Sequence, residues 1–529
     1  MTSRQVGCGS RTVAFRRWAT RLAALGFGAA VLLSSGCSVG DPATGGADSH
    51  HVRLALSVPP SSLDACDSHQ AANGAILIGN ITEALTNLDV TTGKVSPGLA
   101  TQWTETSPTT WQFTLRQGTK FHDGQAFNAE AAASWFKRLI DPNVGCYNNS
   151  SVLNNNVVSA TVVDDNTVQI DLKEPDRILP IRLSFIDIGA PSKDPSKKAT
   201  EPIGTGPFKF VSWSPGSNFE VTRNDEYWGE KPQVDGVTYL FRAESSVRAA
   251  MATTHEVDIA TAIGPQDADM PGAVSYPVSE SMYLRSDLTV APVNDIRVRK
   301  AMNYAVDRQK FIDNVYRGHG TPASDIVIPT VTGYNPAVKW DYEPDKAREL
   351  IAEAGAAGTN VKAPIQIVTE RDYRGSNGSE AADTLSAMFN AVGLNTHVVT
   401  VEDTQTAMTA PEAQSTEAVE VLYAHGNSYG DALISWVGKL GCDGPQSRLC
   451  DKKFDDLLAA AGSATGEDRK AKLQAASQYI YDNVVPFVYV AGMEDTMVIA
   501  NPNLHYTPNA GTNDKLVLAE MTFGGSQGS

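Results

Sequence analysis

The chain has 529 residues, of which 42% are hydrophobic and 19% are charged. This composition is typical of a water-soluble globular protein, and the length exceeds what one hydrophobic core usually supports, so two or three domains are expected. Acidic residues outnumber basic residues by 60 to 43, which gives a formal net charge of −17. Such an acidic balance makes nucleic acid and anionic membrane surfaces poor partners.

The first 36 residues have the composition of an export signal. They contain five arginines and no acidic residue, and an apolar run rich in Ala and Leu covers 22–33. Because this run is too short to span a bilayer, it predicts a secretory signal peptide rather than a transmembrane helix. Removal of residues 1–36 would leave 38 basic against 60 acidic residues, a net charge of −22.

A possible lipid anchor follows the apolar run at Cys37. Gly36 and Cys37 resemble the end of a bacterial lipobox, in which the Cys is lipidated, although Ser34 stands where the usual box has Leu. We therefore expect lipidation of Cys37, with ordinary signal cleavage nearby as the alternative. Residues 38–49 are small, polar and aperiodic, so 37–50 is predicted to be a lipidated cysteine with a flexible tether.

Four cysteines follow Cys37 in the chain: Cys66, Cys146, Cys442 and Cys450. An even number of cysteines in an exported protein favours disulfides, and four cysteines allow three connectivities. The short loop between Cys442 and Cys450 makes that pair the safer one, and Cys66–Cys146 then follows by elimination. Metal ligation is the rival interpretation, but neither a Cys-x-x-Cys pair nor a nearby His cluster supports it.

Residues 97–139 predict a strand, a turn and a capped helix in succession. Trp111, Phe113 and Leu115 alternate with polar residues, as in a strand with one buried face. Turn-forming glycines follow, and Asn128 then stands where the N-cap of a helix is expected.

This ordered stretch resembles the signature of the family 5 extracellular solute-binding proteins, the oligopeptide, dipeptide and nickel receptors of ABC importers. Segments similar to that family recur in the same order at 204–210, 224–228, 295–308 and 453–458. The charges of the 295–308 segment are expected to form a solvated helix face. The resemblance implies a receptor rather than an enzyme, and the chain has no zinc motif that would indicate a hydrolase.

The fold implied by the resemblance is α/β and similar to the type II periplasmic binding proteins, with two hinged lobes and an extra inserted domain. Domain I is expected to combine 51–84, 200–280 and 483–529. Domain II is expected as an insertion at 85–199, and domain III, the second lobe, at 281–482. Ligands of such proteins lie in the cleft between the lobes, which close by a hinge motion.

The function implied by the resemblance is that of the extracytoplasmic substrate-binding component of an ABC importer. It would capture a small solute, first of all an oligopeptide or a dipeptide, and deliver it to a membrane permease. Binding of a non-peptide solute, such as an oligosaccharide or a metallophore, is the alternative, and a ligand-sensing receptor is a third. We expect a monomer without cofactor or resident metal, lipid-anchored on the outer face of the cytoplasmic membrane.

The loop 423–432 resembles the one with which dipeptide receptors bind the α-amine of a peptide. If Asp431 aligns with the second acid of that loop, Ser428 replaces the amine-binding Asp and His425 replaces a stacking Trp. Exchange of a carboxylate for a hydroxyl at a buried ammonium would cost about 1–2 kcal/mol, near tenfold in affinity. Either Asp431 restores the charge after a shift of the loop, or the natural ligand lacks a free amine here.

Further residues of the cleft are suggested by the same resemblance. Arg371 and Arg374 lie where the family has an Arg that meets a ligand carboxylate, with ordinary surface arginines as an equal alternative. Trp436 is as compatible with a core position as with the cleft, and the ligand pattern of the nickel receptors is not reproduced around His425. The complete set of cleft candidates is Tyr423, His425, Asn427, Ser428, Tyr429, Asp431, Arg371, Arg374 and Trp436.

Overall fold

A computed structural model of the protein describes residues 50–524 except for a few short stretches. The stretches outside the description are 70–72, 90–91, 192–193, 374–375, 403, 405–416, 428, 443, 445, 448 and 509–515. The predicted signal peptide, tether and lipidated Cys37 therefore lie outside the described residues, as do Ser428 and Arg374. In the part of the chain that is described, no helix is both long and apolar enough to cross a membrane.

One mixed sheet of 11 strands carries most of the fold. Its strands pair in the order β10-β11-β12-β1-β13-β21-β14-β20-β16-β19, and β15 pairs with β21 beside this path. The bounds are β1 (His51–Leu56), β10 (Phe208–Ser214), β11 (Asn218–Arg223), β12 (Gly236–Phe241), β13 (Ile259–Ala260), β14 (Ala273–Ser286), β15 (Gly320–Pro322), β16 (Pro364–Glu370), β19 (Asn395–Val401), β20 (Ala418–Gly426) and β21 (Phe487–Ile499). Both parallel pairs, such as β1 with β12, and antiparallel pairs, such as β14 with β20, occur in it.

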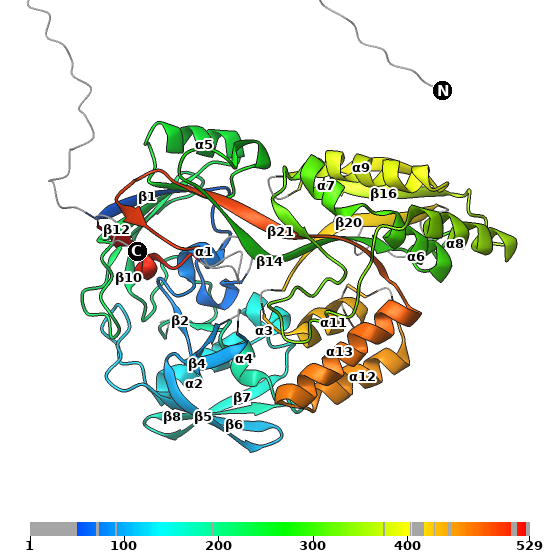
Figure 1. The fold of residues 1–529 in the computed structure, drawn as a ribbon. Helices are drawn as coiled ribbons and strands as arrows, with labels where there is room; N and C mark the ends of the chain where they lie inside the picture. The colour runs from blue at the N-terminus through cyan, green and yellow to red at the C-terminus, as the bar shows by residue number, and fades with distance from the viewer. Residues whose placement is uncertain are drawn as a thin grey trace, which may run out of the picture. The chain divides into compact units, whose positions relative to one another are not determined.

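The long strands β14 and β21 join the two ends of this sheet. Figure 1 shows them running side by side from the group around β1 and β12 to the group around β16 and β20. They pair antiparallel in two runs, 273–277 with 494–498 and 281–285 with 487–492, and the register shifts between the two runs. The same two strands therefore belong to both halves of the molecule.

The hydrophobic side chains gather in separate cores that define two lobes. The first lobe has a core around α2 (Ala129–Leu139), a second around β1 and β12, and a small one at α5 (Ser245–Thr253). The second lobe has one core around α6 to α9 and another around α11 to α13. Because β21 contributes Met497 to a first-lobe core and Val488 to a second-lobe core, the lobes share one backbone element. The fold is thus the expected two-lobed α/β type, while the exact domain boundaries stay a prediction.

The remaining elements complete each lobe. In the first lobe they are α1 (Gly74–Leu77), α3 (Tyr147–Ser151), α4 (Leu179–Leu183), β2 (Glu83–Ala84), β3 (Thr86–Asp89), β4 (Lys94–Pro97), β5 (Ala100–Ser107), β6 (Thr110–Leu115), β7 (Val157–Asp164), β8 (Thr167–Leu172), β9 (Asp187–Ile188), β22 (Leu504–His505) and β23 (Thr522–Phe523). In the second lobe they are α6 (Ile296–Ala305), α7 (Arg308–Val315), α8 (Pro344–Ala356), α9 (Gly378–Ala391), α11 (Ala432–Leu440), α12 (Lys452–Gly462), α13 (Gly466–Asn483), β17 (Asp372–Tyr373) and β18 (Ser376–Asn377). Short 3₁₀ helices lie at Ala65–Asp67, Pro265–Asp267 and Leu518–Glu520.

The strand, turn and helix predicted over residues 97–139 are confirmed. The predicted strand is β6, whose alternating Trp111, Phe113 and Leu115 are buried. The predicted helix is α2, and the side chain of Asn128 caps it by accepting a hydrogen bond from the Ala131 amide at 3.0 Å. Local sequence chemistry is therefore enough to specify this part of the first lobe.

The solvated face expected for the 295–308 segment is wrong for two of its arginines. Arg299 and Arg308 are buried, and their guanidinium groups donate to backbone carbonyl groups, among them those of Val484 and Ala323. Arg297 instead pairs with the helix-capping Asp295. The two buried arginines act as cross-links between loops of the second lobe, where a planar group with five donors can satisfy several carbonyls.

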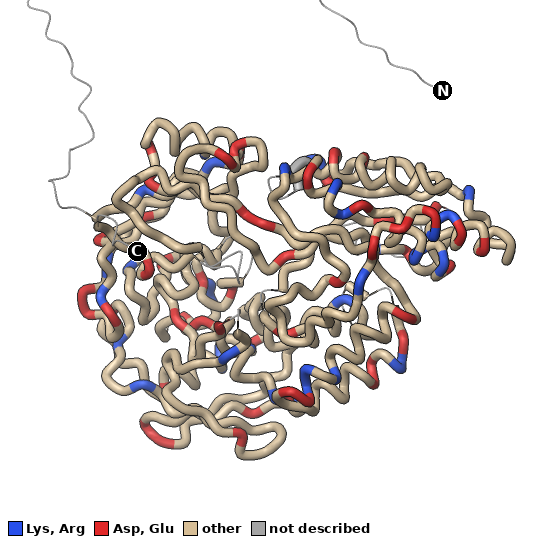
Figure 2. Tube along the Cα trace, viewed as in Figure 1, with Lys and Arg blue, Asp and Glu red and all other residues tan. Residues whose placement is uncertain are grey.

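Elsewhere in this lobe, acidic and basic residues are interspersed along α8 and α13 (Figure 2).

Glu83 of β2 connects two of the family-like segments in space. Its carboxylate accepts hydrogen bonds from the Thr205 hydroxyl at 2.7 Å and the Tyr227 hydroxyl at 2.8 Å. The indole of Trp228 donates a third at 2.8 Å, and burial raises the pKa of Glu83. Thr205 and the two aromatic residues come from the segments 204–210 and 224–228, so this network fastens both segments to β2.

Two disulfides occur among the described residues. Cys66 is joined to Cys146, 80 residues away, and Cys442 to Cys450, 8 residues away. These are the two pairs expected from the sequence. The first ties the start of the first lobe to the turn before α3, and the second closes the loop between α11 and α12.

Candidate functional site

The loop that follows β20 is held at its start by Asn427. The Asn427 side chain donates to the Ile326 carbonyl at 2.7 Å and accepts from the Ser435 hydroxyl at 3.2 Å. Its backbone amide donates to the carbonyl of Ser279 in β14, and the residue is 2% exposed. Asn427 was a cleft candidate, but these contacts give its side chain a structural task.

The same loop is held at its end by Asp431. Its carboxylate forms a two-point ion pair with Arg469 of α13, with Nε–Oδ2 and Nη2–Oδ1 distances of 3.0 and 2.9 Å. It also caps α11 by accepting from the Leu433 amide at 2.9 Å. The side chains of Asp431 and Arg469 are only 1% and 6% exposed. Because the carboxylate is already neutralised, a role for Asp431 at a ligand amine would require this pair to break.

Tyr423 and His425 lie on β20, where they face Tyr283 and Ser281 of β14. Both are half-buried, and the Tyr423 ring packs edge-on to Tyr283 with the ring centres 6.3 Å apart. Trp436, by contrast, is 2% exposed and packs in the core of the second lobe. Its placement among the cleft candidates is therefore corrected: it is a core residue.

Tyr429 reaches from the second lobe to the first. Its ring meets Phe185 in a T-shaped contact with the ring centres 4.9 Å apart, and His69 lies 6.2 Å away. Phe185 belongs to the buried core around α2, against which Tyr429 packs. The loop tip is therefore at the boundary between the lobes.

Arg371 follows directly on β16 and is exposed. Its proposed contact with a ligand carboxylate stays a prediction, as does that of Arg374. Within the described residues, no group of three or more His, Cys, Asp or Glu side chains is arranged to hold a metal ion.

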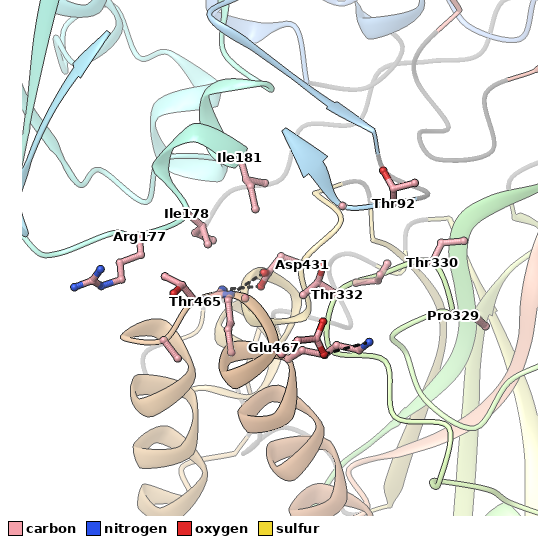
Figure 3. Close-up of a pocket in the computed structure, with 16 residues that line it drawn as sticks. Thr92, Arg177, Ile178, Ile181, Pro329, Thr330, Thr332, Asp431, Thr465 and Glu467 are labelled. Carbon is pink, nitrogen blue, oxygen red and sulfur yellow. Dashed lines mark hydrogen bonds and ion pairs between the residues drawn. The ribbon is translucent and has the colours of Figure 1, made fainter. Parts of the chain in front are cut away.

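A pocket of about 440 Å³ lies between the lobes beside this loop. From the first lobe it is lined by the segment before β4 and by Ile178 and Ile181 at α4, and from the second by 329–332, Asp431 and the first turn of α13. Figure 3 shows Ile178 and Ile181 pointing toward that first turn, near Asp431. Its volume is in the range of small-molecule sites. Because Asp431 is one of its lining residues, the loop suggested by the sequence borders this pocket between the lobes.

Comparison with known proteins identifies the family. The model of the bacterial extracellular solute-binding proteins, family 5, matches residues 94–442. The chain belongs to this family. Among its relatives, the dipeptide-binding protein of Escherichia coli K12 is 28% identical over 449 residues, which cover 77% of this chain and 82% of that protein. Heme-binding protein A of Haemophilus influenzae is 27% identical over 434 residues, with 75% and 79% of the two chains covered.

Solved structures agree with the fold. The periplasmic binding protein DppA of Helicobacter pylori in complex with the peptide STSA superposes with a TM-score of 0.72 at 21% identity, covering 89% of this chain and 98% of that one. NikZ of Campylobacter jejuni in complex with Ni(L-His) also gives 0.72, at 20% identity and 89% and 99% coverage. As a family 5 protein, this chain is the extracytoplasmic solute-binding component of an ABC importer and not an enzyme.

The residues that contact the loop in this family 5 protein could not be predicted from its sequence. Arg469 lies 38 residues after Asp431, and Phe185 lies far earlier in the chain. Neither has a local signal, because α13 reads as an ordinary charged helix and Phe185 as one apolar residue among many. Only the spatial arrangement shows that these residues hold and meet the loop.

We expect Asp431→Ala to destabilise this solute-binding protein by about 3–5 kcal/mol, because the buried Arg469 loses its counter-charge. Urea unfolding measures the effect. The matched control is Asp345→Ala, which removes an exposed ion pair with Arg348 in the same lobe and should cost no more than about 1 kcal/mol. Equal losses for the two variants would show that the Asp431–Arg469 pair does not anchor the loop.

Lys439 of α11 is an unusual buried cation behind the predicted cleft residue Tyr423. Its ammonium lies 5.5 Å from the Tyr423 ring centre and 5.7 Å from that of Tyr283, and donates to the Gln446 side chain at 2.7 Å. Burial, and next the nearby charge of Arg285, lower the pKa of Lys439 to about 7. The folded protein therefore binds this proton more weakly than the unfolded chain does.

Replacement of Lys439 by Met should stabilise the protein, and more at low pH than at high pH. The pKa of Lys439 is lower in the folded than in the unfolded state, so the penalty grows as pH falls from about 10.5 toward 7 and is constant below. Urea unfolding at pH 6 and pH 9 should show a larger gain at pH 6. Lys453→Met, which removes an exposed lysine over the Tyr479 ring, is the control and should show no such trend. A gain for Lys439→Met that is independent of pH would contradict this account.

Proposed function

We propose that this receptor captures short peptides or peptide-like solutes for import. The observation that carries the proposal is the similarity to a dipeptide-binding protein along about three quarters of both chains. A di/tripeptide-binding protein of Pseudomonas aeruginosa, 28% identical over 447 residues, supports the same class of solute. A hollow between the lobes that borders the loop after β20 suits a solute of this size.

We further propose that the solute is held without an ion pair to an α-amine. If Asp431 corresponds to the second acid of the loop in dipeptide receptors, Ser428 takes the place of the amine-binding Asp. The carboxylate of Asp431 itself is already paired with Arg469. A hydroxyl accepts a hydrogen bond from an ammonium group but supplies no charge. Peptides with a blocked or absent N-terminal amine are then acceptable solutes.

A second candidate is a non-peptide solute such as a metallophore. Its support is the 27% identity to a heme-binding protein over a similar share of the chain, together with the fold shared with a nickel-histidine receptor. An oligosaccharide and a purely signalling role are the remaining alternatives.

The place of action proposed for the protein is the outer face of the cytoplasmic membrane. The leader, the lipobox-like Gly36-Cys37 and the polar segment 38–49 support a lipid anchor with a tether. We propose that the receptor works as a monomer, with His425, Ser428, Tyr429 and the two arginines after β16 near the solute. The three-domain division expected from the sequence belongs to the same proposal.

Thermal unfolding with peptide, sugar and metal-chelate panels tests the solute class. A di- or tripeptide at a hundred times its Kd should add about 2.7 kcal/mol to the stability. The N-acetylated form of the same peptide should bind within about tenfold of the free form, since no carboxylate is available for the amine. Stabilisation by another class alone would reject the peptide proposal. Complete loss of binding on acetylation would reject the amine-independent mode.

A further inference from the structure

Tyr429 projects from a loop that is fixed at both ends. Asn427 is bonded to Ile326 and Ser435 on one side, and Asp431 is locked to Arg469 on the other. With only three residues between these two anchors, the loop tip has little freedom relative to the second lobe. A side chain at the tip moves with that lobe as a unit.

The partner of Tyr429 is part of the core of the first lobe. Phe185 is 5% exposed, follows α4, and meets the Tyr429 ring at an interplanar angle of 86°. Next to this contact, the Cα of Gly430 lies close to the Leu88 side chain of β3, where a Cβ would come within 3.1 Å. The loop therefore touches two elements of the first lobe at once.

We propose that Tyr429 is a positioning residue for solute retention: its ring docks on Phe185 of the opposite lobe and holds the closed state. The pair acts on the lifetime of the closed receptor and leaves the choice of solute to other residues. An edge-to-face aromatic pair is worth about two- to tenfold in an equilibrium constant beyond the area it buries. Because opening must break the contact, we expect its loss to appear mainly in the rate of solute release.

Distance measurements on the solute-free receptor test the docking directly. Spin labels at the exposed positions Val162→Cys and Glu349→Cys, one on each lobe, report the inter-lobe distance by double electron–electron resonance. Tyr429→Ala should broaden the distribution toward open states, and Tyr429→Phe, which keeps the ring, should restore the wild-type profile. An unchanged distribution in Tyr429→Ala would overturn the proposal.

The partnership with Phe185 has its own test. Phe185→Leu should open the receptor as Tyr429→Ala does, and the double variant should add little, because both remove the same contact. Far-UV circular dichroism checks that Phe185→Leu remains folded. Effects that simply add would mean that the two rings act separately. Tyr342→Ala, an exposed tyrosine of the second lobe, is the matched control and should leave the distances unchanged.

Release of the dipeptide Met-Leu, followed by stopped-flow fluorescence, adds a kinetic readout that rests on the proposed peptide function. Tyr429→Ala should raise the dissociation rate about two- to tenfold and change the association rate by less than about twofold. A slower association with unchanged dissociation would instead make Tyr429 a recognition residue and overturn the retention role. Failure of Met-Leu to bind the wild type would count against the proposed peptide function. The inter-lobe distances alone would then decide the role of Tyr429.

Discussion

The antiparallel pair β14 and β21 is the constraint on which the arrangement of this receptor depends. The two strands supply residues to cores in both lobes, so the lobes cannot move independently of this ribbon. Continuous ladders of hydrogen bonds resist bending, whereas a register shift interrupts them. Relative rotation of the lobes should therefore concentrate where the pairing of β14 and β21 is broken, close to the Ser279 carbonyl that binds the loop after β20.

The hydrogen bond to the Ser279 carbonyl places the loop after β20 beside the region where the two lobes are expected to bend. The buried pair of Asp431 and Arg469 has a high desolvation cost and is weak evidence for stability in itself. The pair instead fixes the position of the loop, since two parallel hydrogen bonds hold Asp431 in one orientation relative to Arg469. The Asp431 carboxylate is thus used to hold the loop, and Tyr429 contacts the first lobe.

The parts of the structure that could be predicted from the sequence are those set by local chemistry. The strand containing Phe113 and the helix capped by Asn128 follow from alternation and from a side chain that satisfies free amides. For the candidate site, the sequence could suggest a loop but not the residues that contact it, because Arg469 and Phe185 are brought near the loop by folding. Trp436 shows the limit most clearly: an aromatic residue after a binding loop fits a cleft or a core, and only packing distinguishes them.

We expect the two lobes of this receptor to close over a small solute and to hold it unchanged. The most direct measurement is a crystal structure of the receptor purified from its native host without unfolding. We expect electron density for an intact small molecule between the lobes, beside the loop that contains Tyr429. Density for a solute bound only outside the inter-lobe region, with no space left between the lobes, would contradict it.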